Sequence, residues 1–153
     1  MSTKQEDANL ILKLYDLRRE ETMRKARNWF FAEFNPTSTQ DILNVMMGEH
    51  SAYLRMVTTY WDMAASFVNN GAIDEKMFDD ANGEHVSVFA RLEPFLGEMR
   101  EKFGSPRMMQ HLEQLVLRLP DAKQRTTAIR ERIKQIAAMR AEAAATASAG
   151  QSR

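Results

Sequence analysis

Apolar residues recur at steps of three and four along almost the whole chain, which is the spacing of one face of an α-helix. The first such stripe spans residues 7–34 and ends before the Asn35-Pro36 pair. A second begins near Ser38, and its positions follow a heptad-like seam: Ile42, Met46, Glu49, Tyr53, Met56, Tyr60, Met63 and Phe67. This regular seam predicts close, nearly antiparallel packing along a long helical bundle.

Turn and capping residues divide the rest of the chain into three further helices. The punctuating positions are Gly71, Asp74, Gly104, the Ser105-Pro106 pair, Pro120 and Asp121. Glycine is common just after the C-terminus of a helix, and aspartate and serine are common at the N-cap. We therefore predict an all-α fold, an elongated antiparallel bundle of about five helices. The expected organisation is a flexible N-terminus (1–6), a single helical domain (7–140) and a frayed or disordered tail (141–153).

Composition and charge narrow the class of protein. The chain has 153 residues, of which 44% are hydrophobic and 27% charged, so it can form one continuous core. It has no cysteine, which excludes disulfides and zinc-thiolate sites. The polar N-terminus carries no signal-peptide core, and no apolar run reaches the roughly 18 residues of a membrane span. These features predict a soluble, cytoplasmic protein with no membrane span.

Charge is balanced overall but divided along the chain. There are 21 basic and 21 acidic residues, so no net charge attracts the protein to nucleic acid. Residues 1–99 contain 10 Lys or Arg against 16 Asp or Glu, and residues 100–153 contain 11 against 5. Residues 1–99, the front of the chain, thus carry a net charge of −6, and residues 100–153, the back, carry +6. The basic helix over 121–140 lacks interleaved aromatic residues, so nucleic-acid binding is not expected.

Three segments resemble an uncharacterised bacterial helical family known only as a domain of unknown function. They are LYDLRREETMRKARNWF (14–30), YWDMAASFVNNGAIDEKMFDD (60–80) and FARLEPFLGEMREKFG (89–104). The resemblance extends over roughly residues 10–104. It implies a helical fold and supplies no activity, substrate or catalytic residue.

The tripeptide Gly-Glu-His occurs twice, at residues 48–50 and 83–85. Adjacent helical residues point about 100° apart, and the Glu-x-x-His spacing of bundle metal sites is missing, so we expect no metal site and no cofactor. Glu49 and His85 nevertheless occupy seam positions where apolar residues are expected. With a turn near residue 37, Glu49 lies opposite Arg24, Lys25 and Arg27. This geometry predicts a buried ion pair that fixes helix register.

Other features leave two interpretations open. The alternating charges of residues 17–27 indicate a solvated helix face, with an anion or partner site as the alternative. The eleven methionines indicate core filling, with an adaptable groove for a partner helix as the alternative.

Trp29, Phe30 and Phe31 form the strongest candidate interaction surface. Three consecutive helical positions span about 200°, so at least one ring must meet another element or a second chain. Together with the opposed charges, this predicts a non-enzymatic interaction or assembly module whose partner is itself, as a homo-oligomer, or another protein. The alternative is a small-molecule or metal-dependent activity in a polar pocket around Glu49 or His85.

Overall fold

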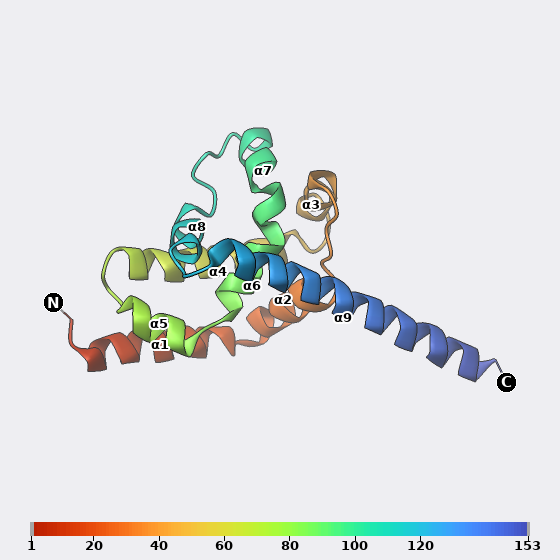
Figure 1. Ribbon diagram of the computed structural model, residues 1–153, viewed down its shortest axis with the longest axis horizontal. Helices are drawn as coiled ribbons and strands as arrows, with labels where there is room; N and C mark the ends of the chain where they lie inside the picture. The colour runs from red at the N-terminus through yellow and green to blue at the C-terminus, as the bar shows by residue number, and fades with distance from the viewer. Residues whose placement is uncertain (1, 153) are drawn as a thin grey trace.

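The computed structural model describes residues 2–152, and within that range the chain forms helices and turns and no strand (Figure 1). The predicted all-α class is confirmed, with shorter and more numerous helices than the five expected. The helices are α1 (Lys4–Arg18), α2 (Glu21–Ala32), α3 (Thr39–Met46), α4 (Ser51–Asn69), α5 (Glu75–Ala81), α6 (Glu84–Leu92), the 3-10 turn η1 (Glu93–Phe95), α7 (Leu96–Lys102), α8 (Gln110–Leu117) and α9 (Ala122–Gln151).

The first predicted helix is broken into α1 and α2 at Arg19 and Glu20. The Glu20 carboxylate accepts hydrogen bonds from the backbone N–H groups of Thr22 (3.0 Å) and Met23 (2.9 Å). Those bonds satisfy amides at the start of α2 and lower the pKa of Glu20. A glutamate within a helical pattern can therefore start a new helix, which periodicity alone does not reveal.

The second predicted helix is also interrupted, in a turn over Met47–His50 between α3 and α4. The expected seam is consequently wrong for α4, because Met63 and Phe67 are each 38% exposed. The buried face is a neighbouring stripe made by Leu54, Val57, Tyr60, Trp61, Ala64, Ala65 and Val68. Apolar residues cover most of the helix circumference, and the small alanines of this stripe permit close packing on both sides.

The third predicted helix is divided twice. Asn82 has an extended backbone and separates α5 from α6, while Pro94 lies in η1 between α6 and α7. The fourth helix begins at Gln110 and not at Ser105, because residues 105–109 form turns. Gly71 ends α4 as predicted, with the positive φ of 79° that glycine adopts without strain.

Both ends of the chain are more helical than expected. α1 begins at Lys4, where Thr3 and Glu6 form a reciprocal capping box. α9 continues to Gln151 through the segment 141–151, which was expected to fray. Alanine has the highest helix propensity, so this alanine-rich segment continues the helix without burying any side chain.

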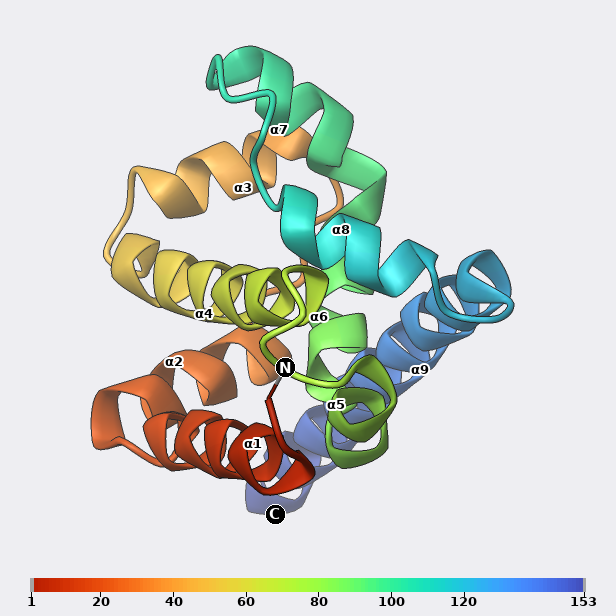
Figure 2. The same cartoon turned by 90° about the vertical axis from the view of Figure 1, so that its left-hand side faces the viewer.

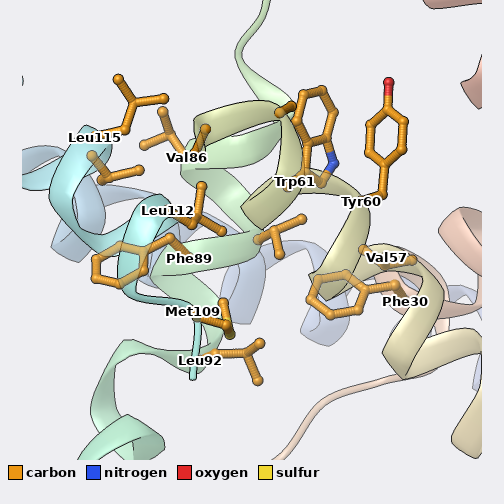
Figure 3. Close-up of a cluster of buried hydrophobic side chains, with 14 of the residues drawn as sticks. Phe30, Val57, Tyr60, Trp61, Val86, Phe89, Leu92, Met109, Leu112 and Leu115 are labelled. Carbon is orange, nitrogen blue, oxygen red and sulfur yellow. The ribbon is translucent and has the colours of Figure 1, made fainter. Parts of the chain in front are cut away.

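The core is centred on α4, which packs against α2 on one side and α8 on the other (Figure 2). Figure 3 shows the side chains that meet there, including Phe30 of α2, Trp61 of α4, Phe89 of α6 and Leu112 of α8. α3 and α7 extend away from this central group, and α9 crosses α6 on its outer side (Figures 1 and 2). Within residues 2–152, no helix is long and apolar enough to cross a bilayer.

Candidate interaction site

The aromatic end of α2 is divided between core and surface. Phe30 is completely buried and Trp29 is 7% exposed, whereas Phe31 is only partly buried. The expectation that all three rings are candidates for an interaction surface is therefore wrong for Phe30, which the rest of the fold covers. Trp29 stacks on Phe34 (5.1 Å between ring centroids) and on His50 (5.2 Å).

This aromatic stack forms one wall of a surface pocket of about 330 Å³. Its lining residues are Trp29, Glu33, Phe34, Asn35, Pro36, Asp41, Val45 and His50. Asp41 accepts hydrogen bonds from the backbone N–H (2.8 Å) and the hydroxyl (3.0 Å) of Thr37, and these bonds lower the pKa of its carboxyl. Glu33 is exposed and makes no ion pair with any residue of the described range 2–152. The carboxylates of Glu33 and Asp41 therefore make this pocket acidic.

The predicted ion pair of Glu49 does not form. Glu49 lies exposed in the turn between α3 and α4, and Arg24 and Lys25 lie exposed on α2. Lys25 instead pairs with Glu21 of its own helix at 3.2 Å. The turn between α3 and α4 breaks the second predicted helix, so Glu49 does not lie opposite these α2 residues.

Glu84 makes the ion pair that was expected of Glu49. Its carboxylate accepts from Arg27 Nε (2.8 Å) and Nη2 (2.7 Å), and from Arg18 Nη1 (3.0 Å). The side chains of Glu84 and Arg18 are only 12% and 14% exposed. This cluster joins α1, α2 and α6. Sequence reasoning missed it because nothing local to Glu84 shows that two arginines lie across from it.

His85 is 1% exposed, and its ring lies against Phe78 (5.0 Å) and Trp61 (5.6 Å). Nε2 is 3.7 Å from Asp79 Oδ1, and neither ring nitrogen has a hydrogen-bond partner within residues 2–152. Of the two polar residues placed in the seam, His85 is thus buried among aromatic rings and Glu49 is not buried. The same described residues contain no group of three or more side chains arranged to hold a metal ion.

Methionines gather at a second pocket of about 420 Å³ between α3, α4 and the segment before α8. Met46, Met99, Met108 and Met109 contribute to its lining. Arg100 fixes one wall by donating to the Met108 carbonyl (2.8 Å) and to Glu113 (3.1 Å). Met99 and Met109 are buried, as core filling predicts, while Met46 and Met108 are only partly covered, and a groove for a partner helix stays a prediction.

α9 is the most exposed element of the fold. Thr126 is its one fully buried residue within the described range, and every residue from 138 to 152 is exposed. Figure 1 shows the C-terminal half of α9 extending beyond the body of the molecule. Arg125, Arg132 and Met139 are exposed and lie seven residues apart, so they share one edge of this helix.

A family model described as Domain of unknown function (DUF4760) matches residues 4–119. This range contains α1 to α8 and ends before α9. No curated protein and no solved structure matches the chain.

Proposed function

The chain belongs to the DUF4760 family, and we propose that this member is a non-enzymatic assembly module that associates with copies of itself. The observation that carries the proposal is the C-terminal half of α9, which is helical and exposed over its full circumference. Isolated helices of such length are marginally stable in water, and most helical stability comes from packing. A helix held away from its own fold is suited to packing on another chain.

A second copy offers a complementary surface. The exposed edge of α9 presents Arg125, Arg132 and Met139, and the pocket beside Trp29 presents the carboxylates of Glu33 and Asp41 next to the ring of His50. Arginine pairs favourably with a carboxylate at such a site. The opposed charges of the chain, −6 for residues 1–99 and +6 for 100–153, support contact between the front of one copy and the back of another.

The contact proposed here joins two different surfaces of the same molecule. Two copies can make it reciprocally across a two-fold axis, or further copies can extend it into a ring or an open chain. The alternative activity around Glu49 or His85 has less support. Glu49 lies in an exposed turn, and His85 is enclosed by Trp61 and Phe78.

Light scattering of the full chain at micromolar concentration tests the proposal. We expect a mass above the 17.6 kDa of one chain at low salt, and a lower mass at high salt because salt screens the charges. Glu33→Arg and Arg132→Glu should each weaken association, and the double variant should restore part of it. Arg24→Glu, at an exposed position on α2, is the matched control and should change nothing. A mass of one chain at both salt concentrations would refute the proposal.

A further inference from the structure

Two adjoining hollows lie beneath α9. The larger, of about 570 Å³, is bounded by residues 35–37, by η1 and by α9, and the smaller, of about 160 Å³, lies beside Phe31. The two share Asn35, Arg91, Ile133 and Ala137. Their combined size suits a small organic molecule.

Arg91 of α6 is the buried charge between the hollows. It is 6% exposed, and its Nη1 donates to the carbonyls of Phe30 (3.0 Å) and Phe34 and to Asn35 Oδ1 (3.2 Å). All three acceptors are neutral. Its Nε is buried and has no hydrogen-bond partner within residues 2–152. Nη2 also donates no hydrogen bond to any residue of that range. Donors of this guanidinium thus remain unused.

Within residues 2–152, the other partly buried arginines each have a carboxylate partner, and Arg91 does not. Arg18 and Arg27 share Glu84, Arg100 pairs with Glu113, and Arg130 pairs with Glu93 at 2.9 Å. Within the described residues, Arg91 has no carboxylate partner. A guanidinium removed from water without a counter-ion is costly, and three neutral oxygens offset only part of that cost.

The surroundings of Arg91 are cationic and apolar. Lys134 and Arg130 line the larger hollow with one acidic residue, Glu131, and Arg140 lines the smaller. Burial, followed by the nearby charge of Arg140, lowers the pKa of Arg91 to about 10, so the guanidinium is still charged at neutral pH. The apolar walls come from Pro36, Pro94, Phe95, Ile133 and Ala137.

We propose that these hollows form a binding site for a small organic carboxylate with an apolar body, whose carboxylate lies against Arg91. A carboxylate accepts paired hydrogen bonds from guanidinium donors and supplies the missing counter-charge. The apolar body lies along η1 and the inner face of α9. The inner wall of the site belongs to the region that matches the family, and the outer wall belongs to α9, which lies beyond residue 119. The site is therefore complete only where α9 is present.

Calorimetry with octanoate, octanol and acetate tests the ligand class on the full chain. We expect saturable binding of one octanoate per chain. Octanol, which lacks the charge, and acetate, which lacks the apolar body, should each bind at least about tenfold more weakly. Equal affinity for octanoate and octanol, or no binding of octanoate, would overturn the proposal.

Variants locate the site without altering Arg91 itself. Ala137→Phe places a ring in both hollows and should abolish octanoate binding, whereas Ala138→Phe, on the exposed side of α9, should leave it unchanged. Lys134→Glu should weaken binding several-fold. Octanoate should also raise the melting temperature of the unmodified chain and fail to do so in Ala137→Phe. Binding that survives Ala137→Phe would place the ligand elsewhere and refute the assignment.

Discussion

At the scale of single residues, the two glutamates of the repeated Gly-Glu-His have opposite environments. Glu84 is held by Arg18 and Arg27, and Glu49 is exposed in a turn. Glu84→Gln should lower the free energy of unfolding by about 2 kcal/mol, because two partly buried guanidinium groups lose their counter-charge. Glu49→Gln is the matched control and should stay within about 0.5 kcal/mol of the unmodified chain. Urea unfolding measures both, and equal effects would show that the Glu84 cluster contributes nothing specific.

Ionisation of Tyr60 limits the stability of the fold at alkaline pH. Its hydroxyl donates to the Leu14 carbonyl, and burial raises its pKa from 10.0 to about 12. Between these values the unfolded chain ionises Tyr60 while the folded chain holds it neutral, so stability is present below pH 10 and falls as the pH rises towards 12. Tyr60→Phe should lower stability at neutral pH by about 1 kcal/mol and flatten the decline above pH 10. Urea unfolding from pH 8 to 12 tests this, and identical slopes for the two proteins would contradict it.

At the scale of the elements, helix ends depend on both local and distant residues. The predicted helix ends at Ser38, Asp74 and Gly71 are present in the structure. Each of these residues caps or ends a helix through backbone groups within a few positions of itself. The start of α8 is instead capped by a residue distant in the sequence. Asp62 of α4 accepts from the backbone N–H of Leu112 at 2.9 Å, so its cap comes from 50 residues away in the chain.

This distant cap can be tested with two substitutions. Asp62→Ala should lower the free energy of unfolding by about 1 kcal/mol, since an amide in the first turn of α8 loses its acceptor. Asp62→Asn keeps a side-chain oxygen and should retain most of the stability. Thermal unfolding followed by circular dichroism distinguishes them. If the two variants melt together well below the unmodified chain, the charge of Asp62 matters more than its role as acceptor.

At the scale of the whole molecule, the end of α9 contributes little to the stability of the fold. Residues 141–151 bury no side chain in their own fold. Truncation after Arg140 should therefore leave the free energy of unfolding within about 0.5 kcal/mol of the full chain. The same truncation keeps Arg125, Arg132 and Met139, so light scattering at low salt should still show a mass above that of one chain. A large loss of stability would mean that the segment packs on its own chain.

The candidate site could be predicted from the sequence only in part. The burial of His85 and an aromatic concentration at Trp29 followed from local pattern. The acidic pocket beside Trp29 could not be predicted. His50 comes from the turn that follows α3, and Asp41 from the first turn of α3, and only the fold brings both to Trp29. Arg91 gave no signal at all, since a buried guanidinium bonded to carbonyls has no local sequence pattern.

The sequence by itself determined the helical class, several helix ends and the family, because periodicity, capping and glycine preferences act over a few residues. Only the tertiary structure decided which apolar stripe of α4 is buried, which glutamate meets Arg18 and Arg27, and that Arg91 lies between two hollows beneath α9. Several arrangements satisfy the same local pattern. The choice among them depends on contacts between residues tens of positions apart, where close packing and the pairing of buried charge select one arrangement.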